Sequence, residues 1–135
     1  RWMAAFNTTT RLFDGLMYLV VIVAGGLFML YGKIEPGEDH FDAAYRELFE
    51  ETGYAGSEPV FLCKVAPNAA CISNFPHCYL IRDCKKVSSQ HLDATEDLEI
   101  VVMSAEATKK LMAEGGLVQA VHVAAMYYAE KILNK

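Results

Sequence analysis

The chain has 135 residues, of which 53% are hydrophobic, and its formal net charge is −5 at pH 7. This length and apolar content predict a single domain, residues 1–135, with a core of its own. The negative charge argues against general affinity for nucleic acids or anionic membranes, although bound metal ions would still allow polyphosphate binding. The four cysteines include no C-x-x-C pair, which disfavours zinc or a disulfide framework and favours reduced thiols in the cytoplasm.

The N-terminal third contains an uncharged run of eighteen residues, Gly15–Gly32. This length is at the lower limit for a membrane-spanning helix. The β-branched cluster in Leu19–Val23, followed by Gly25-Gly26 and Leu27–Tyr31, instead favours two strands joined by a turn. An acidic residue precedes the run and no A-x-A site follows it, which disfavours a signal peptide. We therefore expect two buried strands, no membrane association, and a homodimer that covers leftover apolar surface.

The next segment predicts a turn followed by a helix. Pro36-Gly37 favours the turn, and Asp39 can cap the N-terminus of a helix over about Phe41–Thr52. Gly53 is placed to end that helix in a left-handed conformation. One stripe of the helix is apolar and is expected to be buried: Phe41, Ala44 and Leu48.

Three carboxylates, Glu47, Glu50 and Glu51, lie at helical spacing i, i+3 and i+4 and so converge on one face. Like charges this close repel one another unless a cation lies among them. Mg²⁺ fits this face, because it takes oxygen ligands and keeps waters and substrate phosphates in its shell. The alternative interpretation is a solvated acidic helix face without a ligand.

The segment 32–54 as a whole reads Gly32, five residues, Glu38, seven residues, Arg46-Glu47-Leu48, one residue, Glu50-Glu51, one residue, Gly53-Tyr54. This pattern resembles the signature box of the Nudix hydrolases at every position. The resemblance implies binding of Mg²⁺ or Mn²⁺ and cleavage of the pyrophosphate of a nucleoside diphosphate linked to another moiety. It also implies an α+β fold, the Nudix-type α/β/α sandwich with a mixed β-sheet between helices.

The resemblance assigns roles by position. Arg46 would pair with Glu38 and steady a ligand carboxylate. Gly32 would let the backbone approach the metal, and Gly53 would support the helix end. The metal ions would lower the pKa of the attacking water. The carboxylate ligands of the metal would be Glu47, Glu50 and Glu51. Glu47 would also be a catalytic residue, together with Arg46.

After the box, three strands, a loop and two helices are expected, an order that fits an α+β sandwich. The strands are Val60–Val65, His77–Arg82 and Glu99–Met103, the loop is Ala66–Phe75, and the helices are Ala105–Glu114 and Gln119–Leu133.

Two of these segments resemble functional loops of the family. Pro67-Asn68-Ala69-Ala70 with Ser73-Asn74 resembles a loop of the ADP-ribose pyrophosphatases, which implies that Pro67, Asn68 and Asn74 contact the substrate. The acidic stretch Leu92–Glu99 resembles the loop that supplies a catalytic carboxylate, with Glu96 as the candidate general base and Asp97 and Glu99 behind it. A solvated acidic loop is the alternative.

The N-terminal region departs from the family pattern. Sugar-nucleotide members usually have a basic residue and Leu-Pro-Ala-Gly before the box, where this chain has Met29–Gly32. They also carry an N-terminal strand subdomain that binds the nucleoside and builds the dimer. With only Arg1–Asp14 in that place, we expect this subdomain to be absent or truncated.

The last helix carries polar and aromatic residues that have two interpretations. His122 either faces the active cleft or is a structural histidine in the core or at the surface, whereas His77 and His91 are expected to be structural. Met126 and Tyr127-Tyr128 are expected to pack the helix, a base-stacking platform being the alternative.

Three functions are therefore open. The chain is expected to hydrolyse ADP-ribose or another NDP-sugar, as the Pro67 loop and the C-terminal helix pair favour. A nucleoside triphosphate pyrophosphohydrolase is the alternative that the missing subdomain favours. A non-catalytic Nudix-like nucleotide-binding domain comes third, since it would not need the full set of carboxylates.

Overall fold

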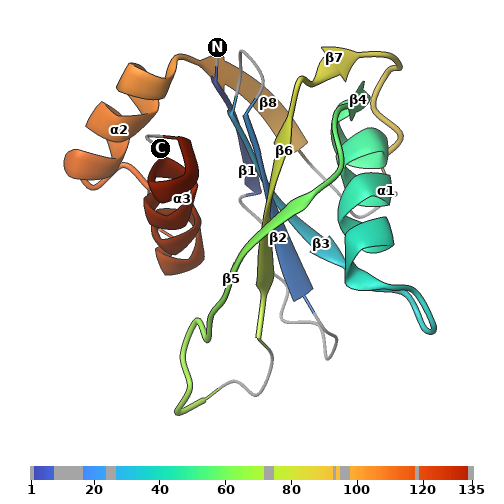
Figure 1. Ribbon diagram of the computed structural model, residues 1–135, viewed down its shortest axis with the longest axis horizontal. Coiled ribbons are helices and arrows are strands. Elements are labelled where there is room, and N and C mark those ends of the chain that lie inside the picture. The colour runs from blue at the N-terminus through green and yellow to red at the C-terminus, as the bar shows by residue number, and fades with distance from the viewer. Residues whose placement is uncertain are drawn as a thin grey trace.

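The computed structural model describes residues 2–7, 17–23, 27–71, 75–92, 94, 98–117 and 119–133. Strands precede and follow a first helix, and two further helices end the described chain (Figure 1). In chain order the elements are β1 (Trp2–Asn7), β2 (Met17–Val23), β3 (Leu27–Lys33), α1 (His40–Thr52), β4 (Tyr54–Ala55), β5 (Val60–Lys64), β6 (His77–Arg82), β7 (Lys85–Lys86), β8 (Leu98–Met103), α2 (Ala105–Ala113) and α3 (Ala120–Leu133).

The largest sheet of the described residues has the strand order β3-β2-β6-β5. Strands β2 and β6 are parallel, whereas β2–β3 and β5–β6 are antiparallel, so the sheet is mixed. Two smaller antiparallel pairs stand beside it: β1 with β8, and the two-residue strands β4 with β7. Strand β1 also contacts β3, so the β1–β8 pair lies beside the β3 edge of the main sheet.

Helices cover both faces of the main sheet, with α1 on one side and α3 on the other (Figure 1). The alternation of side chains along β6 explains how one strand serves both layers. Tyr79 and Ile81 join the core under α1, whereas Cys78 and Leu80 join the core under α3. The predicted α/β/α sandwich with a mixed sheet is confirmed.

The predicted N-terminal strands are also confirmed. Strands β2 and β3 contain the two apolar segments and pair in register from Met17↔Lys33 to Val23↔Leu27. The predicted turn at Gly25-Gly26 lies outside the described residues. Among the described residues, no helix is both long enough and apolar enough to cross a membrane.

Two packing predictions are wrong. Ala44 and Leu48 are fully buried as expected, but Phe41 keeps 42% of its surface exposed. Its ring packs against the ring of Tyr79, with centroids 5.1 Å apart, at the flank of α1. On α3, Met126 is buried as predicted, whereas Tyr127 and Tyr128 are exposed and contact each other edge to face. In both helices the apolar stripe is wider than the sheet that covers it.

Strands β1, β4 and β7 were not predicted. β4 and β7 have two residues each, which is too short for a periodic pattern to show. β1 pairs with β8, a partner more than ninety residues away, and this pairing leaves no local pattern.

Candidate active site

Helix α1 is fixed at both ends by the residues that the sequence indicates. The Asp39 side chain accepts a hydrogen bond from the backbone N–H of Phe41 at 2.8 Å, which caps the helix. Gly53 has φ 68°, and its N–H donates to the carbonyl of Phe49 at 2.7 Å. These caps orient the acidic face of α1 within the fold.

Segment 86–91, which starts at the last residue of β7, covers the C-terminal end of α1. Sequence reasoning missed this contact. The N–H groups of Val87 and Ser88 both donate to the carbonyl of Gly53, and His91 N–H donates to Glu50 at 2.7 Å. A Cβ on Gly53 would lie 2.1 Å from the Ser88 carbonyl oxygen, so this close approach needs glycine as much as the positive φ does. Segment 86–91 therefore satisfies the backbone carbonyls of Glu50 in α1 and of the cap residue Gly53, directly before the acidic stretch that starts at Leu92.

Arg46 connects three glutamates of the box, and we call it the hub. Its Nε and Nη2 donate to the two carboxylate oxygens of Glu38 at 2.7 and 2.9 Å, a bidentate pair. Its Nη1 donates to Glu47 Oε1 and to Glu50 Oε2, both at 2.8 Å. The predicted pairing of Arg46 with Glu38 is thus present, and the same guanidinium holds two of the predicted metal ligands.

The charges of this network stabilise one another. The hydrogen bond from Arg46 lowers the pKa of Glu38, and that bond likewise raises the pKa of Arg46 above its ordinary value. Glu38 also accepts the N–H of Glu35 at 3.0 Å, which ties the turn before α1 to the hub. The turn, the helix and the guanidinium therefore form one connected unit.

The predicted metal ligands differ in exposure. Glu47 and Glu51 are buried, with 7% and 2% of their surface exposed, whereas Glu50 lies nearer to solvent. Gly32 lies in β3, against which α1 packs, and pairs with Tyr18 of β2. Carboxylate and carbonyl oxygens are the donors that Mg²⁺ prefers, so the donor set fits a hard divalent cation.

Arg46 holds two of these carboxylates, those of Glu47 and Glu50. Within the described residues, no three His, Cys, Asp or Glu side chains are grouped so as to hold a metal ion. The guanidinium provides the positive charge that offsets the repulsion between Glu47 and Glu50.

The other predicted site residues lie elsewhere or outside the described residues. Pro67 and Asn68 lie on the loop after β5, beyond the end of the sheet (Figure 1). Asn68 caps a turn there, because its Oδ1 accepts the N–H of Ala70 at 3.2 Å. Asn74 and Glu96 are outside the described residues.

The histidines have distinct surroundings. His122 is buried in α3, on the side of the sheet opposite α1, and burial lowers its pKa to about 4. The core interpretation of His122 therefore holds. His77 is buried and stacks on His40 with ring centroids 4.4 Å apart, and His91 lies beside Ser88, with Nε2 and Oγ 3.0 Å apart.

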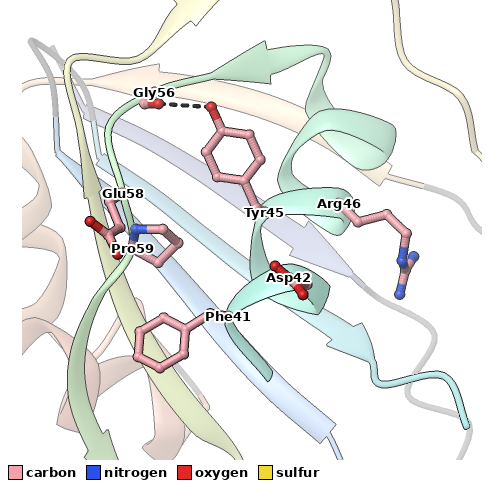
Figure 2. A pocket seen from close by; sticks show the side chains of 7 residues that line it. All are labelled: Phe41, Asp42, Tyr45, Arg46, Gly56, Glu58 and Pro59. Atoms are coloured by element: carbon pink, nitrogen blue, oxygen red, sulfur yellow. Dashed lines mark hydrogen bonds between the residues drawn. The ribbon is translucent and has the colours of Figure 1, made fainter. Parts of the chain in front are cut away.

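A shallow pocket of about 530 Å³ lies on the outer flank of α1 (Figure 2). The hydroxyl of Tyr45 donates to the carbonyl of Gly56 at 2.8 Å and forms one wall. Arg46 lines the edge, but its guanidinium points away from Phe41 and Pro59 (Figure 2). The pocket therefore lies beside the carboxylate face rather than over it. Its remaining lining residues are Asp42 and Glu58.

The NUDIX domain model matches residues 21–120, which include the whole box and most of the sandwich. The chain belongs to the NUDIX family. Among curated proteins, this NUDIX chain is 28% identical over 100 residues to the methanol dehydrogenase activator of Bacillus methanolicus. The match covers 73% of this chain and 54% of that protein, so the chain spans about half the length of this relative.

One solved structure supports the fold. The crystal structure of an ADP compounds hydrolase matches with a TM-score of 0.73 and 21% identity, covering 98% of this chain and 73% of that chain. The solution structure of the E. coli ORF135 protein matches with a TM-score of 0.45 and 16% identity, over 71% of this chain and 79% of that one. The first of these places the NUDIX fold over nearly the whole chain.

Proposed function

We propose that residues 1–135 form a single catalytic domain that hydrolyses the pyrophosphate bond of a nucleoside diphosphate linked to another moiety, with ADP-ribose or an NDP-sugar as substrate. The observation that carries this proposal is the complete box, in which Arg46 holds Glu38, Glu47 and Glu50 together. A domain that only binds nucleotides has no need for this arrangement. The structural relative named an ADP compounds hydrolase agrees with the substrate class.

The reaction would use Mg²⁺ or Mn²⁺ held by Glu47, Glu50 and Glu51, with the backbone carbonyl of Gly32 as a further ligand. The metal would neutralise phosphate charge and acidify the attacking water. The bidentate pair with Glu38 would hold the guanidinium of Arg46 in place while the carboxylates of Glu47 and Glu50 bind the metal. The burial of Glu47 and Glu51 limits competing hydration of the ligand oxygens.

The remaining roles fall to two loops. Glu96 would accept the proton of the attacking water, because the box glutamates lose basicity when they bind metal. Pro67, Asn68 and Asn74 would contact the substrate from the loop between β5 and β6.

Product analysis tests the function directly. Incubating the chain with a panel of nucleotides and Mg²⁺, and separating the products, should give AMP and a sugar phosphate from ADP-ribose. Inorganic pyrophosphate from a nucleoside triphosphate would instead support the housecleaning function. No product from any substrate would support a binding domain and contradict the proposal.

The role of the carboxylate face has a matched control on the same helix. Glu51→Gln keeps the shape of a buried side chain but removes a charged ligand, and losing an outer contact alone typically costs about 10–100-fold. We expect at least that loss in turnover for Glu51→Gln, whereas Asp42→Asn, on the other flank of α1, should stay near wild type. Wild-type turnover of folded Glu51→Gln would rule out this mechanism.

The proposal includes a cytoplasmic homodimer. The four cysteines are free thiols, which agrees with a reducing compartment. Exposed aromatic side chains on α1 and β5 offer apolar surface for a second copy: Phe41, Tyr45, Phe49 and Phe61. Light scattering coupled to gel filtration measures the mass in solution, and a monomer at micromolar concentration would contradict the dimer.

A further inference from the structure

Two of the free cysteines lie directly opposite each other in the sheet. Cys63 of β5 and Cys78 of β6 are register partners in an antiparallel pair, and the ladder continues to Val65, whose N–H donates to Pro76 at 3.1 Å. The Cα atoms of such partners are about 4.5–5.5 Å apart. The ladder is irregular between Phe61 and Cys63, but Cys63 and Lys64 pair in regular register with Cys78 and His77. A disulfide typically requires roughly 4.4–6.8 Å between Cα atoms, so this register places the pair in the range for a disulfide.

The two thiols also share one environment. Both side chains are buried in the core under α3, with Leu80 and Met126. The two thiols influence each other: the neighbouring Cys78 lowers the pKa of Cys63, whereas Cys63 and burial raise the pKa of Cys78. Cys63 keeps 7% of its surface exposed and lies on the edge strand β5, whereas Cys78 is fully buried, so Cys63 is the thiol that an oxidant in solvent reaches first.

The other two cysteines are placed differently. Cys71 is exposed on the loop between β5 and β6, and Cys84 lies between β6 and β7 with its thiol directed at the carbonyls of Ile81 and Arg82. Neither has a cysteine as register partner in the described strands. Among the described cysteines, only Cys63 and Cys78 face each other across a pair of strands.

We propose that Cys63 and Cys78 are a reversible dithiol–disulfide site that fastens the β5–β6 hairpin under oxidising conditions. A low-molecular-weight disulfide such as oxidised glutathione is the oxidant. The Cys63 thiolate attacks one of its sulfurs and releases one small thiol, which leaves a mixed disulfide on Cys63. The Cys78 thiolate then attacks the Cys63 sulfur and releases the second small thiol. The protein loses two electrons and two protons, which the two small thiols carry away.

The bond would close a loop that contains Pro67 and Asn68. Because those residues belong to the proposed substrate-binding loop, an effect on catalysis would rest on the proposed function. The covalent bond itself does not, since it depends only on the β5–β6 register. The test is therefore built on the bond and on the mobility of the loop, and neither readout requires turnover.

The test uses the full chain with Cys71→Ser, so that the exposed thiol cannot confuse the assignment. Folded protein is exposed to oxidised glutathione, remaining thiols are blocked, and trypsin is added. Cleavage after Arg46, Lys64 and Arg82 places Cys63 and Cys78 in separate peptides. We expect these peptides, 47–64 and 65–82, to appear linked by mass spectrometry and to separate after reduction.

Matched variants fix the assignment. Cys84→Ser in the same background should retain the linked peptides, whereas Cys63→Ala should lose them. Oxidation should also slow cleavage of the native loop at residues 65–76 by a nonspecific protease, and reduction should restore it. If Cys63→Ala fails to fold, the peptide map of the parent chain still decides the question.

Two results would overturn the proposal. One is a folded, glutathione-treated chain in which both peptides stay unlinked, and the other is a linked pair that forms only after the chain is unfolded in urea. Because the map needs no substrate, a chain that forms the bond but hydrolyses nothing would refute the proposed function alone.

Discussion

The two faces of the central sheet differ in what they bury. Under α1, the carboxylates of Glu47 and Glu51 are almost fully enclosed beside the Arg46 hub. Under α3, the described core residues form an apolar cluster, and the buried His122 is kept neutral by its burial. Burying a charge costs free energy unless the charge is paired. If stability were the only requirement, both faces of the sheet would be expected to have apolar cores like the one under α3. The difference agrees with the proposal that α1 carries the catalytic carboxylates, whereas the residues of α3 pack the core on the other face.

The largest effect should come from the proposed general base. Glu96→Gln keeps the side-chain volume but cannot accept a proton, so turnover should fall by about 10²–10⁴-fold with substrate binding nearly unchanged. Steady-state kinetics on Glu96→Gln and Glu47→Gln, side by side, measures this. If Glu47→Gln shows that pattern and Glu96→Gln does not, the base belongs to α1 itself.

A cavity under α3 should affect stability and leave the chemistry intact. Met126 is fully buried, and Met→Ala in a core typically costs about 2–5 kcal/mol. Urea unfolding of Met126→Ala should show this loss, while the turnover of the folded fraction stays at the wild-type value. A drop in kcat for fully folded Met126→Ala would show that the two faces are not independent.

Replacing Arg46 should affect metal binding and activity, whereas replacing Met126 should affect stability. Arg46→Lys keeps a positive charge but loses the bidentate fork on Glu38, and changes behind metal ligands typically cost about 10–100-fold in activity or metal affinity. Titration with Mn²⁺ followed by its electron paramagnetic resonance signal should show weaker metal binding. Arg82→Lys, at the exposed end of β6, is the matched control and should bind metal like wild type.

The smallest effect is the pH response of the α3 face. The pKa of His122 is lowered from 6.5 to about 4, so between these values the unfolded chain binds the proton and the folded chain does not. Stability from this residue is complete above pH 6.5 and decreases as the pH falls, by on the order of 1–2 kcal/mol between pH 7 and pH 5. Burial also lowers the pKa of His77, which acts in the same direction. Urea unfolding of His122→Gln should therefore show a shallower pH dependence, and an unchanged slope would refute the assignment.

Local signals made most of the fold predictable. Asp39 and Gly53 mark the ends of α1 because capping is decided within a few residues. The strands β2, β3 and β6 follow from apolar runs that a two-sided sheet requires. By contrast, the exposure of Phe41 depends on where the sheet ends beside α1, and a periodic pattern contains no information about that limit.

The contacts within the box were predictable only in part. The spacing of Glu47, Glu50 and Glu51 places them on one helix face, and the family resemblance adds the pairing of Arg46 with Glu38. That the same Nη1 also holds Glu47 and Glu50 depends on the rotamer of a long side chain, which sequence spacing does not determine.

The closure of α1 by segment 86–91 has a consequence for the dynamics of the backbone. This segment has almost no regular secondary structure, yet the amides of Val87 and Ser88 are bonded to the carbonyl of Gly53, the C-cap of α1, and the amide of His91 to the carbonyl of Glu50 in its last turn. Amide hydrogens exchange with solvent only when such bonds open, so these three should exchange together with the last turn of α1 rather than at the rate of a surface loop. Hydrogen–deuterium exchange would then divide the chain into cooperative units that cross the boundaries of its helices and strands.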